Sequence, residues 1–488
     1  MKSLSIGWHG RWVVLAVLAV SCGCKVGPDY RPPHINLPTR FVEASTLPST
    51  TQPTSGPAEV VDLQHWWESF HDPVLNRLIA DGIDSNLDVQ LAEARVLEAR
   101  AILQGNVATL FPTVDSSASY SRSQFSKNAF SSLRGTSVPG GRSDLYQAGF
   151  DAGWEVDLFG GTRRAIESAQ ANLQSQVEAR RNAMITFLSE VARNYMILRG
   201  LQQELAIVNS NVAGQKEFLE LTRSKFQAGI ATDLDVARQE AQVASTESAI
   251  PTIRTQIQQA IHRLGVLLGR NPEDLEAQLA AVGALPGGPP VVPPGLPSDL
   301  LRRRPDVQQA ERQLAAATAN IGVATADLFP KLSLTGSFGW QSQQLKSWFS
   351  SSSQMWSFGP NLAWRIFDAG QIRANINVQN ARQQEALILY SQTVLQALSD
   401  VEDALVAYQK EQERRQTLQK SVEANQRSFA LARQLNQAGV VDFLNVLTAE
   451  QNLFISQDQL SQSNQAVSTN LVALYKALGG GWETFDPR

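Results

Sequence analysis

The most constraining feature of this chain is that its second half repeats its first. Residues 88–112 and 306–330 align without a gap, and 11 of these 25 positions are identical. A second alignment, at an offset of 210 residues, pairs Trp154 with Trp364, Gly160 with Gly370 and Arg163 with Arg373. Solenoid repeats have periods of roughly 20–50 residues, so two copies of about 200 residues indicate a duplicated half-molecule. We therefore predict pseudo-twofold symmetry within one chain.

Residues 1–23 have the composition of a signal peptide. Lys2 and Arg11 supply positive charge, and residues 12–20 form an apolar run. As a helix this run would cover only ~14 Å, which is less than half of the ~30 Å hydrocarbon core of a membrane. The run therefore predicts a cleaved signal peptide and not a membrane anchor.

Two cysteines follow the apolar run, and each is preceded by a small residue. This arrangement resembles the lipid-attachment site of bacterial lipoproteins. We predict that Cys24 is acylated, with Cys22 as the alternative. If Cys24 becomes the first residue of the mature chain, no cysteine remains to form a disulfide.

The composition excludes several function classes. The net charge of −4 is mildly acidic and there is no basic block, so the chain lacks the electrostatic footprint of a nucleic-acid-binding protein. The 5 histidines do not have the spacing of metal ligands, and Gly160-Gly161 lacks the Gly-Lys-Ser/Thr sequence that cradles phosphate. No nucleophile lies in a recognisable catalytic motif. We predict that the protein is not an enzyme and that it uses no cofactor or metal.

The two copies share one order of segments, which gives the expected domain organisation. Each repeat is predicted to run as helix, strand hairpin, very long helix, glycine-containing turn and return helix. The expected ranges are a lipidated segment and equatorial start (24–80), repeat 1 (81–269), a proline- and glycine-rich linker (270–297), repeat 2 (298–478) and a C-terminal tail (479–488). Within the repeats they are hairpin 113–156, long helix 161–228 and return helix 232–268, then hairpin 331–366, long helix 370–437 and return helix 442–478.

Apolar residues recur every seven positions along both predicted long helices. In the first helix the stripe consists of Val177, Met184, Val191, Leu198, Leu205, Val212, Leu219 and Phe226. In the second it consists of Leu387, Val394, Val401, Tyr408, Val422 and Phe429, with Arg415 interrupting it. Such heptads predict supercoiled helices that pack along their whole length, about 100 Å at ~1.5 Å per residue. Heptads alone do not exclude a plain coiled-coil rod.

Four segments alternate apolar and polar residues with a period of two. Between residues 146 and 156 the even positions are Tyr146, Ala148, Phe150, Ala152, Trp154 and Val156. Residues 332–340 and 356–366 show the same alternation, and residues 113–125 show it more weakly. Segments of about ten residues with one apolar and one polar face are typical of transmembrane barrels with a wet interior. A soluble sheet is the alternative, but no predicted helix has a spare apolar face to cover it.

Four strands are too few to close a barrel, because about eight are needed before side chains fill the interior. An open sheet edge in lipid would leave backbone N–H and C=O groups without hydrogen bonds, at a cost of several kcal/mol each. We therefore predict that the chain is an oligomer whose subunits share one barrel.

Several motifs, in order along nearly all of the mature chain, resemble those of the TolC-like outer-membrane efflux proteins, in their lipid-anchored NodT/OprM-type branch. The motifs are residues 27–30, 154–160, 296–301, 303–307, 367–370 and 474–482. The resemblance implies a membrane α+β fold with an internal duplication: a trimeric 12-stranded β-barrel with four strands per chain, continued by a 12-helix periplasmic α-barrel with a mixed α/β equatorial collar. It also implies three kinds of partner, which are outer-membrane lipid, a periplasmic adaptor protein and an inner-membrane RND pump. The expected location is the cell outer membrane, lipid-anchored and extending into the periplasm.

The first helix reversal is predicted from the residues themselves. Gly229 ends the long helix in the left-handed conformation that glycine adopts at little cost, and Gly439 occupies the matching position in the second copy. Thr232 is predicted to be an N-cap, with Asp233 and Asp235 favourable in the first turn. By resemblance, Asp235 matches a residue that latches the closed tip of the family.

The second helix reversal matches the periplasmic constriction of the family. By position, Leu444 matches an apolar gate residue, while Asn445 and Thr448 stand where relatives often carry aspartate. The missing carboxylates argue against a strong cation-binding ring. The alternative, that these residues serve only as caps and core, stays open.

The function that follows is that of a passive exit duct of a tripartite efflux pump, exporting drugs or other small solutes. One alternative is an outer-membrane duct that serves a protein or metal-ion exporter. Another is a trimeric surface adhesin or structural coiled coil. Adhesins carry one anchoring unit at the C-terminus, whereas strand hairpins occur twice in this chain and internally, which favours the duct.

Overall fold

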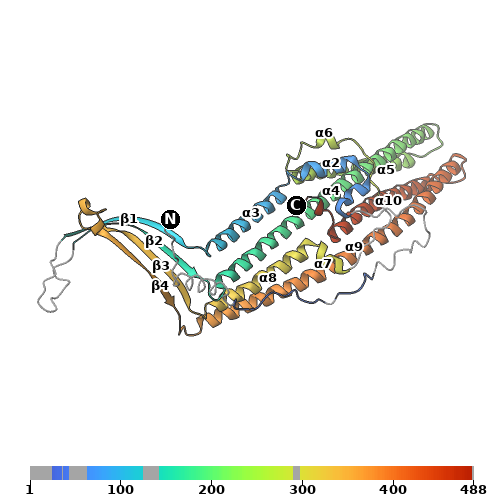
Figure 1. The fold of residues 1–488 in the computed structure, drawn as a ribbon. Helices are drawn as coiled ribbons and strands as arrows, with labels where there is room; N and C mark the ends of the chain where they lie inside the picture. The colour runs from blue at the N-terminus through green and yellow to red at the C-terminus, as the bar shows by residue number, and fades with distance from the viewer. Residues whose placement is uncertain (1–24, 36, 43–62, 125–141, 289–296, 486–488) are drawn as a thin grey trace, which may run out of the picture. The chain divides into compact units, whose positions relative to one another are not determined.

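The computed structural model describes residues 25–35, 37–42, 63–124, 142–288 and 297–485 (Figure 1). The predicted signal peptide and both cysteines lie outside these ranges, so the cleavage and the acylation of Cys24 stay predictions. The chain divides into two compact units. One unit contains the residues up to 33 together with 97–175 and 310–389, and the other contains 34–96, 176–309 and the residues from 390 onward.

The two repeats have the same order of elements. The first contains α3 (Leu87–Ala108), β1 (Thr113–Gln124), β2 (Arg142–Val156), α4 (Gly161–Gln227) and α5 (Asp233–Leu267). The second contains α8 (Pro305–Ala326), β3 (Lys331–Ser342), β4 (Gln354–Ala363), α9 (Gln371–Gln437) and α10 (Phe443–Ala477). The short elements are η2 (Leu63–Phe70), α2 (Pro73–Gly82), α6 (Glu276–Leu279), α7 (Pro297–Arg303), η3 (Leu345–Ser347), η4 (Ser351–Ser353) and η5 (Glu483–Phe485). Of the helices in the described ranges, none combines the length and the apolar character needed to cross a membrane.

The four strands form one antiparallel sheet in the order β1-β2-β3-β4 (Figure 1). The register places large apolar residues opposite one another, with Phe150 paired to Phe338 and Phe338 paired to Trp356. Because successive side chains of a strand point to opposite faces, the even-numbered apolar residues of the four strands share one face, as predicted. Pro360 lies in β4, which is the last strand of the described sheet.

The second hairpin is shorter than predicted. β4 ends before Trp364 and Ile366, so the predicted range 331–366 was too long. The indole Nε1 of Trp364 donates to the carbonyl of Leu328 at 3.1 Å, which fixes this side chain to the turn that follows α8. Trp154, its counterpart in the first repeat, donates to the carbonyl of Leu110 at 2.8 Å. Leu110 and Leu328 are also counterparts, so the same bond occurs in both repeats and confirms the internal duplication.

The predicted heptad stripes are buried along most of α4 and α9. Val191 and Leu198 of α4 and Val401 of α9 are fully buried, and Arg415, which interrupts the second stripe, is half-buried. Burial along a seven-residue period indicates helices that pack lengthwise against their neighbours. Burial of the stripe ends in the last turn of α4, where Phe226 is 44% exposed.

Aromatic side chains from both ends of the chain pack into the core of the second unit, among aliphatic side chains of the long helices. Trp66 stacks on Tyr475 with ring centroids 5.0 Å apart. The guanidinium of Arg181 lies 4.4 Å from the ring centroid of Trp482, within the range of a cation–π interaction. Apart from the four-stranded sheet, the described residues contain no strand. The described part of the second unit is therefore helical, whereas the resemblance implied a mixed α/β collar.

The motif Arg303-Arg304-Pro305-Asp306-Val307 is built around one buried arginine. Arg304 is 9% exposed, and its Nη2 donates to Asp306 at 2.6 Å and to Asp400 of α9 at 2.9 Å. Its Nη1 donates to the carbonyl oxygens of Ala397 in α9 and Ala477 in α10. Arginine is seldom buried unless it is paired, so this side chain acts as a structural cross-link between three helical segments.

Candidate functional site

The two helix reversals have the same backbone geometry. Gly229 and Gly439 have φ angles of +74° and +72°, and the turns are closed by bonds from Ile230 N to Lys225 O (2.8 Å) and from Val440 N to Leu435 O (2.9 Å). These are the bonds of a Schellman motif, which needs a left-handed residue after the helix. A Cβ at either glycine would meet no atom within 4 Å, so glycine is required by conformation and not by space. The predicted reversals at both glycines are confirmed.

The first reversal continues into a capping box. The Thr232 backbone N–H donates to Asp235 Oδ2 at 2.9 Å, and the Asp235 N–H donates to Thr232 Oγ1 at 3.3 Å. Asp233 lies in the same first turn, where carboxylates interact favourably with the helix dipole. The N-cap prediction for Thr232 is confirmed, and Asp235 is placed in that local cap. Its latch role stays a prediction.

The second reversal divides the start of α10 into a buried side and an exposed side. Phe443 stacks on Phe218 of α4 with centroids 5.6 Å apart and an interplanar angle of 10°. Leu444 is 48% exposed, and Asn445 and Thr448 are exposed as well. The structure therefore brings the three predicted gate residues together on one face, turned away from the chain's own helix pair.

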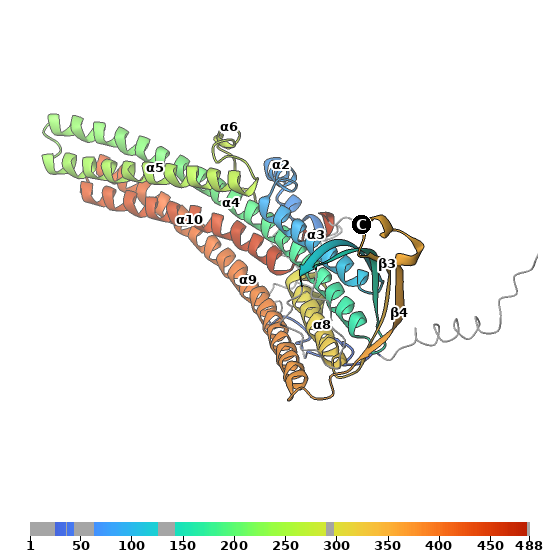
Figure 2. The same cartoon turned by 90° about the vertical axis from the view of Figure 1, so that its left-hand side faces the viewer.

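Polar bonds join the two helix pairs, α4–α5 and α9–α10, which lie side by side near their turns (Figure 2). Lys225 Nζ donates to Asn436 Oδ1 at 3.4 Å, and Asn436 Nδ2 donates to the carbonyl of Val441 at 3.1 Å. Farther from the turns, Asn211 Nδ2 donates to Gln457 Oε1 at 3.1 Å. Sequence reasoning missed these residues, because amides on a long polar helix give no sign of which neighbour they meet.

A cavity of about 240 Å³ lies between α4, α9 and α10, and Phe218 of the stacked pair is one of its lining residues. Its charged lining residues are Glu217, Arg433 and Glu450. Burial raises the pKa of Glu450 to about 7, and a hydrogen bond from Gln239 opposes this shift only in part. Within the described part of the chain, Glu450 Oε2 and the Oε1 atoms of Gln215 and Gln239 have no hydrogen-bond partner. A protonated Glu450 can donate a hydrogen bond, which the carboxylate cannot.

Replacing Glu450 with Gln is expected to remove a pH dependence of stability. The folded protein holds the Glu450 proton more tightly than the unfolded chain does. The resulting contribution to the free energy of unfolding is complete below the ordinary glutamate pKa and is lost as the pH rises through about 7. Charging the buried group costs up to about 3 kcal/mol at alkaline pH. Thermal unfolding midpoints of the two proteins should converge near pH 4, below the ordinary glutamate pKa, and the wild type should fall below the variant near pH 8.5. Glu217→Gln, on the exposed rim, is the control, and parallel curves for wild type and Glu450→Gln would contradict the assignment.

Comparison with known proteins identifies relatives that match almost the whole chain. The family described as outer membrane efflux protein matches residues 78–270 and 296–480. Nodulation protein T of Rhizobium leguminosarum bv. trifolii is 32% identical over 464 residues, which are 94% of this chain and 95% of the relative. The pyoverdine export outer membrane protein OpmQ of Pseudomonas putida is 34% identical over 89% of this chain and 92% of the relative.

The fold is also that of a solved channel. The structure of the outer-membrane channel OprN matches with a TM-score of 0.85 and 35% identity, covering 94% of this chain and 100% of that one. The match includes the four-stranded sheet and the long helix pairs of both repeats, since nearly all of the chain is covered. The fold class expected from alternation and heptads is confirmed.

Proposed function

This chain belongs to the outer membrane efflux protein family, and on that premise we propose that three copies of it form the outer-membrane exit duct of a tripartite efflux pump. The observation that carries the proposal is the pairing of one amphipathic four-stranded sheet with two long helix pairs in a single chain. The sheet supplies a wall that faces lipid on one side and water on the other. The long helix pairs supply the wall of a tunnel. The duct is passive and performs no chemistry.

The edges of the sheet support the trimer. β1 and β4 are the first and last strands of the described sheet, and each pairs with one neighbour only. In lipid, the free backbone groups of these edges need partners from other chains. Three chains would contribute twelve strands, enough to close a barrel with a water-filled interior.

The proposed partners are a periplasmic adaptor protein and an inner-membrane pump of the RND type. OpmQ is described as a pyoverdine export protein. We extend to this chain only the general substrate class, which is small solutes. The proposed location is the outer membrane, with Cys24 acylated and with the helix pairs in the periplasm.

The gate is proposed to lie at the second helix reversal. Leu444 is large, apolar and half exposed at the start of α10, and it faces away from Phe218. Three such side chains meeting on an axis would form a dry ring that an ion could cross only by losing water. Asn445 and Thr448 share the exposed face and add no charge to it.

Cross-linking of the purified protein in mild detergent is expected to stop at three chains. In the proposed trimer the third chain pairs with the first, so every sheet edge is used and a fourth chain has no free strand to join. The measurement is the ladder of cross-linked species against reagent concentration, with a heat-denatured sample as the control. A stable monomer that keeps its β-sheet signal would contradict the shared barrel.

A further inference from the structure

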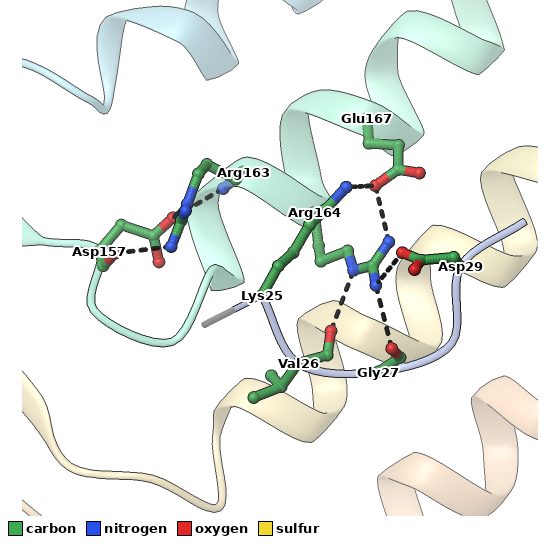
Figure 3. Close-up of polar contacts among 8 residues, drawn as sticks. All are labelled: Lys25, Val26, Gly27, Asp29, Asp157, Arg163, Arg164 and Glu167. Atoms are coloured by element: carbon green, nitrogen blue, oxygen red, sulfur yellow. Dashed lines mark hydrogen bonds and ion pairs between the residues drawn. The ribbon is translucent and has the colours of Figure 1, made fainter. Parts of the chain in front are cut away.

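The N-terminal segment 25–30 contains the motif Gly27-Pro28-Asp29-Tyr30, for which neither the gate nor the duct gives a role. In the structure this segment lies across the start of α4 and beside α8, all within one compact unit (Figure 3). Val26 N donates to the carbonyl of Phe159 at 3.1 Å. At the other end, Tyr30 OH donates to Glu311 Oε1 of α8 at 3.0 Å.

One buried arginine holds this segment. Arg164, in the first turn of α4, is 1% exposed. Its Nε donates to the carbonyl of Val26 at 2.9 Å, and its Nη2 donates to the carbonyl of Gly27 at 3.0 Å and to Asp29 Oδ1 at 2.8 Å (Figure 3). A guanidinium presents a rigid fork of donors, and here three of its hydrogen bonds go to the same short segment.

A second charge pair completes the arrangement. Glu167, one turn along α4, accepts from Arg164 Nη1 at 2.9 Å and pairs with Lys25 (Figure 3). Burial acts to raise the pKa of Glu167, but Lys25 and Arg164 together hold it below its usual range. The side chain of Arg164 therefore contacts the segment directly. It also orients the carboxylate of Glu167, which pairs with Lys25 at the start of the segment.

Backbone contacts show that the segment fits a shaped groove. Gly27 has a φ of +86°, and a Cβ at this position would overlap the backbone of Gly322 in α8. Gly160, with a φ of +80°, would place a Cβ 2.9 Å from Lys25 Cα. Two glycines are thus required where the segment meets the rest of the unit, one from each side of the contact. Close approach of this kind is a packing arrangement and not a chance surface contact.

We propose that Arg164 is the docking residue of the N-terminal segment and that it fixes the lipid-anchored end of the chain to the junction between β2 and α4. The docking follows from the contacts above. The role in anchoring rests on the proposed acylation of Cys24, which precedes Lys25 by one peptide bond. When the segment is docked, the lipid anchor is held next to the start of α4 and the sheet. Without docking, only an undocked segment would connect the anchor to the folded unit.

Hydrogen exchange of the full-length protein in detergent tests the docking. In Arg164→Gln, the amide of Val26, which donates to the carbonyl of Phe159, should exchange about tenfold faster or more, because opening of the segment no longer breaks the guanidinium bonds. Arg163→Gln is the matched control, since Arg163 adjoins Arg164 but bonds to Asp157 (Figure 3). Exchange in residues 184–201 should be the same in all three proteins, which verifies that the variants are folded.

Gly27→Ala disrupts the same contact by changing the segment and leaves α4 unchanged. It should also accelerate exchange of the Val26 amide. Unchanged exchange there in both Arg164→Gln and Gly27→Ala would overturn the proposal. Fatty-acid labelling of the same samples separates the two parts, because a failure of acylation would remove the anchoring role while leaving the exchange result intact.

Discussion

Leu444→Ser is expected to raise single-channel conductance severalfold and to make cells leak large antibiotics. The side chain is half exposed at the start of α10, where the proposed ring excludes water from the axis. Taking a charge out of water costs several kcal/mol, so a dry leucine ring is a strong barrier to ions. Serine would shorten the apolar side chain and add a hydroxyl group that interacts with water. The measurement is conductance of purified protein in planar bilayers, with antibiotic susceptibility of cells as the second readout.

Ile455→Ser is the matched control for the gate. Ile455 lies on the same helix eleven residues after Leu444, which is about three turns, so both side chains point in nearly the same direction. Its exposed fraction is 47%, against 48% for Leu444. The control should leave conductance close to that of the wild type. If the two variants behave alike, the constriction lies elsewhere along the duct.

Arg304→Met is expected to cause the largest loss of stability among the substitutions considered. Removal of one partner from a buried ion pair leaves the remaining charges without compensation, at a cost of about 3 kcal/mol or more. Asp306, Asp400 and the carbonyls of Ala397 and Ala477 would lose their shared donor. Thermal unfolding in detergent should show a markedly lower midpoint, and the yield of assembled protein in membranes should fall.

Arg303→Met provides the comparison for that loss. Arg303 precedes Arg304 in the same motif, but its side chain is exposed. The same change at this position should lower the unfolding midpoint little, because exposed charges contribute about 0–1 kcal/mol. Equal losses in the two variants would show that the motif acts through its overall charge and not through the buried cross-link.

The strands and long helices were predictable because their physical cause is periodic. Alternation in residues 146–156 fixes which face of a strand is apolar, and the heptads fix which side of a helix is buried. The turn glycines were predictable because the residue after a helix often adopts the left-handed conformation, which glycine reaches at little cost. These features are local, and a single sequence contains all of the information that they need.

The end of β4 and the environment of single polar residues were not predictable. Trp364 continues the alternation, but its indole bonds to Leu328, a residue distant along the chain. Glu450 is one carboxylate among many on the helices, and only burial by the packed helices raises its pKa. The contacts of Arg164 with the N-terminal segment also join parts of the chain more than 130 residues apart. Such effects depend on tertiary packing, which periodicity does not specify.

We propose that three copies of this chain enclose one aqueous duct with a gate at the second helix reversal. Single-channel recording of purified complexes, cross-linked beforehand to fix their stoichiometry, tests this most directly. We expect small and brief conductance steps from the wild-type trimer and larger, longer steps from the Leu444→Ser trimer. Trimers that insert into the bilayer but conduct in neither form would contradict it.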